Sequence, residues 1–224
     1  MIKIVQCWDD GIVDDIRLCE MLRGFGARAS FNLNAGLHGA QRGEAWRYKN
    51  LKDVQRLALG ELRDVYEGFT IANHTLTHPW LSKITPDQLR CEVTDGRRRL
   101  QDLFGEEVAG FAYPFGEHPP QAVEAVREAR HVYARTCGNR HPAFPAAGDP
   151  MKLESDCHFK DPRFWEYYEE AKAAGSPAFY FWGHSYEMVT EGDWEEFAAK
   201  LARFDGDTDA DWTDLPDLFP RCKS

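Results

Sequence analysis

Two histidines four residues apart, His74 and His78 in the segment NHTLTHPWL, have a spacing that suits metal chemistry. If the chain turns helical here, both imidazoles lie on one face and can reach one ion at about 2.0–2.1 Å, the usual zinc–nitrogen distance. A third ligand is still needed, and Asp10 can supply it if its strand ends on the same rim. A pair of hydrogen-bonded structural histidines is the alternative that such a motif leaves open.

The adjacent carboxylates of Asp9 and Asp10 follow an apolar segment, 2–8, that is typical of a buried strand. Successive side chains of an extended chain point to opposite sides, so the two carboxylates can do different jobs. One could bind a metal while the other accepts a proton. The competing interpretation is an ordinary turn at the end of the strand, because Asp and Gly are common turn residues.

The elements that must position these residues alternate along the chain. The strand candidates are 2–8, 27–34, 69–73, 110–113, 132–136, 152–157 and 178–183, and the amphipathic helix candidates are 13–23, 52–66, 85–104, 121–130, 163–174 and 194–204. This alternation favours βα units and a parallel sheet. Seven strands over about 200 residues predict a single α/β domain, a closed or nearly closed barrel like a TIM barrel. A doubly wound open sheet is the alternative.

The polar residues singled out above all follow predicted strands. In a parallel barrel the carboxyl ends of the strands share one face, where active sites lie. That face would collect Asp9, Asp10, His74, His78, the turn Tyr113-Pro114-Phe115 and His184.

Composition excludes several classes of function. The 224 residues carry a net charge of −10, which disfavours nucleic acid and anionic membranes as partners. The six cysteines include no CxxC pair, so we expect free thiols and neither a cysteine zinc site nor a redox pair. No apolar stretch approaches the ~20 residues of a membrane span. If Met1 is the native start, we expect a cytoplasmic protein, although a removed export signal would leave the same start.

The segment after about residue 205 is rich in aspartate. Asp205, Asp207 and Asp209 match the first three ligand positions of a calcium loop, but Ala210 and Pro216 stand where glycine and glutamate are needed. We therefore expect a solvated acidic tail rather than a calcium site.

Four motifs, WDDG, NHTLTHPWL, FAYPFG and FYFWGHS, resemble in order and spacing those of the polysaccharide deacetylases of carbohydrate esterase family 4. The resemblance covers residues 2 to about 185. It implies a distorted barrel of about seven strands forming one catalytic domain over residues 1–224. It also implies a metal-dependent hydrolase that removes N- or O-linked acetyl groups from a carbohydrate, with a divalent ion, most simply Zn²⁺, as cofactor.

The resemblance also implies a role for individual residues. Asp10, His74 and His78 would bind the metal, Asp9 would be the catalytic base, and His184 would be the catalytic acid. The backbone N–H of Phe115 would contact the oxyanion. Tyr113 and Trp182, like Trp8 and Trp80, are aromatic residues close in sequence to this site that could face a sugar ring, although each could equally pack in the core.

The chain departs from the family pattern in three places. Ala112 stands where the third motif often has an arginine that orients the base, which leaves the orientation of Asp9 unexplained. The family's aspartate that tunes the acid has no clear match. Asp156 is a weak candidate, for which a surface position is favoured, and His158 follows it. Phe181 replaces a leucine and would narrow the acetyl pocket.

Two other functions remain open at the level of sequence. One is a relative that acts on a small cyclic amide or a non-sugar acyl group. The other is a catalytically weak glycan-binding protein that keeps the metal. Because both the acid and the base positions are filled, the sequence favours an enzyme. Acetate release from chitin oligomers would favour the deacetylase, and tight glycan binding without turnover, even with metal restored, would favour the binding protein.

Overall fold

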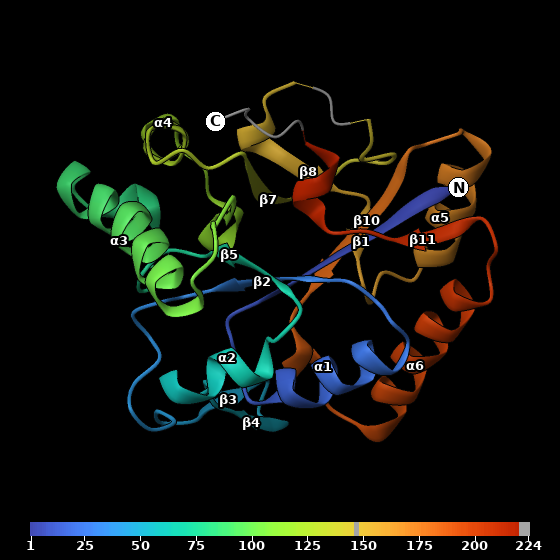
Figure 1. Cartoon of the computed structure of the whole chain (residues 1–224), viewed down its shortest axis with the longest axis horizontal. Coiled ribbons are helices and arrows are strands. Elements are labelled where there is room, and N and C mark those ends of the chain that lie inside the picture. Colours follow the sequence, from blue (N-terminus) through green and yellow to red (C-terminus); the bar gives the residue numbers. More distant parts are fainter. Residues whose placement is uncertain (146–147, 220–224) are drawn as a thin grey trace.

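Short apolar strands form a parallel sheet that nearly closes on itself, with the helices placed around it (Figure 1). The computed structural model describes residues 1–145 and 148–219. Along the main path the strand order is β8-β7-β6-β5-β2-β1-β10-β9, and β11 pairs with β1. Each pairing in this sheet is parallel.

The elements follow the predicted alternation. The strands of the main sheet are β1 (Ile2–Asp9), β2 (Ser30–Leu33), β5 (Thr70–Asn73), β6 (Gly110–Ala112), β7 (Tyr133–Asn139), β8 (Leu153–Ser155), β9 (Cys157–His158), β10 (Ala178–Gly183) and β11 (Ala210–Trp212). The α-helices are α1 (Asp14–Gly24), α2 (Leu62–Val65), α3 (Pro86–Phe104), α4 (Pro120–Glu128), α5 (Phe164–Ala173) and α6 (Glu191–Asp205). Short 3₁₀ turns are η1 (Leu59–Glu61), η2 (Leu81–Lys83), η3 (Pro114–Gly116), η4 (Pro150–Lys152), η5 (Ser185–Glu187) and η6 (Leu215–Leu218).

One stretch of chain nearly closes the barrel. Strand β8 pairs with β7, and β9 pairs with β10, with only Asp156 between the two short strands. The Asp156 carboxylate accepts the backbone N–H of Tyr180 on β10 (2.8 Å), and the Asp156 N–H donates to the Tyr180 carbonyl (2.7 Å). The segment 153–158 therefore spans the gap between β7 and β10. The predicted distorted, nearly closed α/β barrel is confirmed and the open sheet is excluded, although the described residues form nine strands in this sheet rather than seven.

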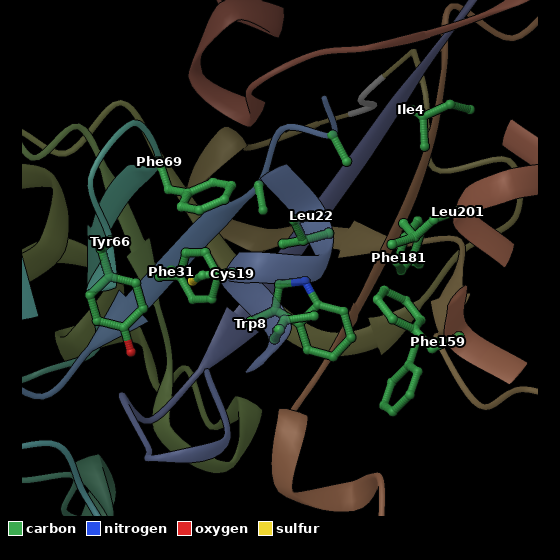
Figure 2. Close-up of a cluster of buried hydrophobic side chains, with 14 of the residues drawn as sticks. Ile4, Trp8, Cys19, Leu22, Phe31, Tyr66, Phe69, Phe159, Phe181 and Leu201 are labelled. Atoms are coloured by element: carbon green, nitrogen blue, oxygen red, sulfur yellow. The ribbon is translucent and has the colours of Figure 1, made fainter. Parts of the chain in front are cut away.

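The core explains why two aromatic residues near the site are unavailable to a ligand. Trp8 is fully buried, packs on Phe159 with ring centroids 5.0 Å apart, and donates its Nε1–H to Oε1 of Gln6 (2.9 Å). Figure 2 shows it among Phe159, Phe181 and Leu201. Phe181 contacts Phe164 of α5 and Phe204 of α6, so the expectation that it narrows an acetyl pocket is wrong.

The predicted helix over 52–66 is wrong for most of its length. Residues Lys52–Val54 form β4, which pairs with β3 (Trp46–Tyr48) in an antiparallel hairpin, and only the end of the segment is helical. Lys49 and Asn50 have φ angles of 46° and 57°, the left-handed conformation that tight hairpins require. Val54 and Leu57 are buried, so their helix-like spacing serves the hairpin and the following loop instead.

The segment after residue 205 is only partly the solvated tail that its aspartates suggested. Ala210–Trp212 forms β11 alongside β1, and Leu215 is buried. Asp214 is also buried and forms an ion pair with Arg28. Apolar side chains between the aspartates thus attach the segment to the barrel. The five cysteines in the described part of the chain are free thiols, and Cys222 lies outside the described residues.

Candidate active site

The predicted metal ligands come together at the carboxyl ends of two strands. Asp10 directly follows β1, and His74 directly follows β5. One ligand atom from each of Asp10, His74 and His78 can be chosen so that all three lie within 4.8 Å of one another. Asp10 and His78 have φ angles of 84° and 57°, so both side chains are aimed by a left-handed backbone that non-glycine residues rarely adopt.

The histidine pair lies on a loop, so the predicted helical turn is wrong. Glu92 of α3 holds this loop by accepting the backbone N–H groups of Leu76 (2.9 Å) and Thr77 (2.8 Å). Thr75 Oγ1 accepts the N–H of His78 (3.0 Å). The loop brings the two imidazole centroids to 4.7 Å, so hydrogen bonds from α3 and Thr75 do what a helical turn was expected to do.

These three side chains have the donor chemistry of a divalent cation site. His74 Nδ1 donates to the carbonyl of Ala112 (2.7 Å), which leaves Nε2 with a free lone pair. Burial lowers the pKa values of His74 and His78, so both imidazoles are neutral at pH 7. Oδ1 of Asp10 is buried and has no hydrogen-bond partner among the described residues. A carboxylate with two neutral imidazoles fits the ligand set of a catalytic zinc site.

Asp9 is held beside this cluster by two neighbours that the motifs did not indicate. Asn32 Nδ2 donates to Asp9 Oδ1 (2.6 Å), and Arg135 Nη2 contacts Asp9 Oδ2 in a fully buried ion pair. Burial raises the pKa of the Asp9 carboxyl, but the charge of Arg135 and the hydrogen bond from Asn32 lower it, and the net effect holds that pKa well below its usual range. Asp9 is therefore a carboxylate throughout the physiological pH range.

Arg135 supplies the guanidinium that orients Asp9 although position 112 is an alanine. The register of β6 and β7 pairs Ala112 with Arg135, so the arginine stands on the next strand, directly beside the position where the family often carries it. Its guanidinium also lies over the ring of Trp182, 4.5 Å from the centroid, and Nη1 donates to the carbonyl of Thr136 (3.2 Å). Trp182 is half-buried, and the face of its ring packs against the Arg135 guanidinium.

His184 lies beside the two adjacent aspartates. Its Nε2 is 3.9 Å from Oδ2 of Asp9 and 3.9 Å from Oδ2 of Asp10. Its Nδ1 is 3.5 Å from Oε2 of Glu187, and that oxygen is 2.7 Å from Nε2 of His158. Burial lowers the pKa of His184, but the neighbouring carboxylates of Glu187, Asp9 and Asp10 raise it overall. This arrangement suits a proton donor.

The short turn η5 that carries His184 is anchored to α1 by a buried carboxylate. Asp15 accepts the hydroxyl of Ser185 (2.5 Å), the hydroxyl of Tyr66 (2.6 Å) and the N–H of Ile12 (3.1 Å). Ser185 directly follows His184, and Ile12 lies two residues after Asp10. Asp15 therefore fixes the acid and the metal-ligand segment relative to each other.

Glu187, rather than Asp156, contacts His184, the predicted acid. Asp156 is 1% exposed and accepts hydrogen bonds from the N–H groups of Ala143 and Tyr180 and from Nδ1 of His141, so the favoured surface position is wrong. It closes the barrel instead. His158 reaches the site, but through Glu187 and not toward the metal ligands.

The remaining aromatic predictions divide between the core and the rim. The Tyr113 side chain is fully buried and its hydroxyl donates to the Met151 carbonyl (3.0 Å), so its predicted contact with substrate is wrong. Phe115 is 47% exposed, lies 4.6 Å from the ring of His78, and stacks on Trp80 at 3.9 Å and 9°. Phe115 and Trp80 therefore form an exposed aromatic platform beside the metal ligands.

Sequence comparison places most of this site within one family. A family model described as polysaccharide deacetylase matches residues 2–134, which include Asp9, Asp10, both histidine ligands and Phe115. The match ends just before Arg135, so Arg135, His184 and Glu187 lie beyond it. The curated Bacillus subtilis protein YxkH, named as a polysaccharide deacetylase, is 20% identical over 127 residues, or 56% of this chain and 41% of YxkH. The chain thus spans about two fifths of that relative's length.

Solved structures show the same fold. A family 4 acetyl xylan esterase from Clostridium thermocellum, solved with a cobalt ion, is 16% identical with a TM-score of 0.57 over 96% of this chain and 90% of that one. The Bc1960 peptidoglycan N-acetylglucosamine deacetylase is 16% identical with a TM-score of 0.59 over 97% and 87%. A polysaccharide deacetylase from Bacillus cereus is 19% identical with a TM-score of 0.51 over 66% and 44%.

Proposed function

The chain belongs to the polysaccharide deacetylase family, and we propose that it is a metal-dependent hydrolase that removes acetyl groups, N- or O-linked, from an acetylated carbohydrate. The observation that carries this proposal is the juxtaposition at one barrel rim of a cation ligand set, a carboxylate and a histidine. A binding protein needs no such set of acid and base, so the glycan-binding alternative is less well supported.

Asp10, His74 and His78 would hold the cation. Bound there, a divalent ion would lower the pKa of water and polarise an acyl carbonyl. Zn²⁺ is the ion that the one-carboxylate, two-imidazole set favours. Asp9 is not needed as a ligand, because Asn32 and Arg135 already hold it. Its ionised carboxylate is thus free to accept the proton of the attacking water.

His184 would supply the proton that the leaving group needs. An amine leaves an acyl centre readily only after protonation, and the raised pKa of His184 keeps its proton available near neutral pH. Glu187 stabilises the imidazolium and orients it, much as the third member of a catalytic triad orients its histidine. The two proton-transfer groups thus lie side by side next to the cation ligands, with His184 Nε2 3.9 Å from Asp9 Oδ2, where one can accept a proton from water and the other can donate one to the departing amine.

The rim suits a sugar. Trp80 is 43% exposed and Phe115 is 47% exposed, and large aromatic groups so placed beside a reactive centre usually mark a binding surface. Sugar rings present apolar C–H faces that pack on aromatic faces. The platform lies next to His78, where the acetyl group of a bound sugar would meet the cation.

Acetate release tests the proposal. Purified zinc-loaded protein would be incubated with chitin oligomers and with acetylated xylan oligomers, and acetate would be measured enzymatically. We expect release from at least one of them, its loss in Asp9→Asn, and its loss after chelation with recovery on adding metal. Glycan binding without turnover in the metal-loaded protein would contradict the proposal and favour the binding alternative. Turnover of small cyclic amides alone would favour the alternative of a hydrolase that acts on small cyclic amides.

A further inference from the structure

Arg56 lies at the same rim and has no assigned role. Its Nη2 is 3.8 Å from Oδ1 of Asp10, too far for a hydrogen bond, and its Nε is buried without a hydrogen-bond partner among the described residues. The side chain is 22% exposed. A guanidinium offers five N–H donors in a rigid fork, so Arg56 retains donors for a further acceptor.

The hairpin β3–β4 and the loop after it fix the orientation of Arg56. The guanidinium carbon lies 4.8 Å from the ring centroid of Trp46, which is the arrangement of a cation over an aromatic face. Trp46 and Tyr48 both pack on Tyr186, and Tyr186 lies 4.9 Å from the ring of His184. The aromatic wall of Trp46, Tyr48 and Tyr186 therefore connects Arg56 to the catalytic acid across the mouth of the site.

The charge balance of the site makes Arg56 available. Asp9 is paired with Arg135, and Glu187 faces the imidazoles of His158 and His184, so neither carboxylate is paired with Arg56. Asp10 is the carboxylate nearest to Arg56 among those of the site, and in the working protein its charge would be shared with a divalent cation. The positive charge of Arg56 is then uncompensated, in a chain whose net charge is −10. Such a cation with a preset orientation favours a planar anion.

We propose that Arg56, held on Trp46, forms a carboxylate-binding subsite beside the cation ligands, and that the preferred substrate is an acetamido sugar that also bears a carboxylate. The inference rests on the proposed function, since it names the substrate class of the same site. A carboxylate near the acetyl group would accept a two-pronged hydrogen bond from Arg56, while the ring would rest near the exposed platform of Trp80 and Phe115.

A matched pair of substrates tests the proposal. N-acetylglucosamine and N-acetylmuramic acid differ by a lactyl ether that carries a carboxylate, and kcat and KM for acetate release would be measured for both. We expect the wild-type protein to prefer the carboxylate-bearing sugar at least tenfold in kcat/KM. Arg56→Gln should abolish that preference by raising KM for the acid sugar alone, and Arg56→Lys should keep part of it.

Controls separate this subsite from other roles of Arg56. Arg98→Gln removes the same charge from an exposed position on α3 and should leave the preference intact. Equal losses on both sugars in Arg56→Gln would overturn the subsite, because Arg56 would then act through Asp10. Relief of acetate inhibition in Arg56→Gln with the sugar preference unchanged would also overturn it, since the bound carboxylate would be the product.

Binding without turnover keeps this inference separable from the proposed function. Calorimetry on zinc-loaded Asp9→Asn protein would measure the affinity for each sugar, with and without Arg56→Gln. We expect Arg56→Gln to weaken binding of the acid sugar about tenfold and to leave the neutral sugar unchanged. A binding preference with no acetate release by the wild type would support the subsite and contradict the deacetylase. Acetate release with no preference in rate or binding would support the deacetylase and contradict the subsite.

Discussion

The guanidinium of Arg135 on β7 forms a buried ion pair with the carboxylate of Asp9 at the end of β1. Both side chains are almost completely inaccessible, at 1% and 3% exposure. The pair fixes the orientation of the predicted base from a strand that the recognised motifs do not include. Ala112 is paired with Arg135 in the register of β6 and β7, so the guanidinium reaches Asp9 from the strand next to Ala112.

Replacing Arg135 should impair both stability and activity. Arg135→Met leaves Asp9 buried and unpaired, which costs on the order of 3–5 kcal/mol of unfolding free energy. It also raises the pKa of Asp9, so the acidic limb of the profile of kcat/KM against pH should move to higher pH. The rate should fall about 100-fold, within the range that a general base contributes. Chemical denaturation and pH-rate profiles measure these effects.

A second arginine tests whether position or identity matters. Ala112→Arg in the Arg135→Met protein returns a guanidinium to the neighbouring strand and should recover part of the rate. If the single Arg135→Met variant were as stable as the wild type and kept its acidic limb, the orienting role of Arg135 would be disproved.

Glu187 should control the proton affinity of His184. Its carboxylate, 3.5 Å from Nδ1 of His184, raises the pKa of His184, so Glu187→Gln should lower that pKa. A general acid must be protonated to act, and the alkaline limb of kcat should therefore move to lower pH, with a rate loss of about tenfold at pH 8. His158→Gln removes the second imidazole that contacts the same Glu187 oxygen, so the Glu187 charge acts on His184 alone and the limb should not move to lower pH. An unshifted alkaline limb in Glu187→Gln would contradict the claim that Glu187 raises the pKa of His184.

Asp15 should make stability depend on pH. Burial raises its pKa from 3.8 to about 7, despite the hydrogen bonds from Ser185 and Tyr66 that lower it. The folded state therefore binds the Asp15 proton more tightly than the unfolded state. This contribution to stability is complete below pH 3.8 and is lost as the pH rises through 7. Between these two pH values, the contribution of Asp15 to the free energy of unfolding falls by about 1.4 kcal/mol per pH unit.

The variant Asp15→Asn isolates the contribution of Asp15 to the pH dependence of stability. The difference in unfolding free energy between wild type and variant, measured by denaturant titration from pH 4 to pH 8, should shift steadily in favour of the variant. The buried histidines oppose this trend equally in both proteins and cancel in the difference. A difference that stays constant with pH would show that Asp15 is ionised throughout.

Trp80 should contribute to sugar binding rather than to chemistry. Trp80→Ala removes one half of the exposed stack with Phe115 and should raise KM for an oligosaccharide several-fold with little change in kcat. Trp165→Ala, which alters a partly buried tryptophan on α5, serves as the control for nonspecific loss of aromatic packing. An unchanged KM in Trp80→Ala would show that the platform of Trp80 and Phe115 does not bind the sugar.

Much of the fold and the metal-ligand set follows from local sequence. Alternating strand and helix patterns predict the barrel, and Asp10, His74 and His78 each lie directly after or near a strand end, where parallel strands must converge. The β3–β4 hairpin escapes that reasoning, because Val54, Leu57 and Leu62 have a spacing that fits a helix as well as a short strand followed by a loop. Only the pair Lys49-Asn50 signals the turn, and weakly.

The residues that orient Asp9 and His184 could not be predicted in the same way. Arg135 and Asn32 act across strands, and their role depends on the register of β7 and β2 in the sheet. An arginine inside a strand whose first four residues are buried is the one sequence signal for a buried ion pair, since a buried charge is retained when it is paired. Glu187 is only three residues from His184, but that spacing is common and becomes informative once the η5 turn is known.

The cation content of the purified protein tests the central claim most directly. After extensive dialysis against metal-free buffer, elemental analysis of the wild type and of Asp9→Asn should find about one equivalent of a divalent cation. His74→Ala should retain almost none, because it removes one of three ligands. A wild-type protein that takes up no divalent cation when Zn²⁺ is supplied, or a His74→Ala protein that keeps a full equivalent, would contradict the account.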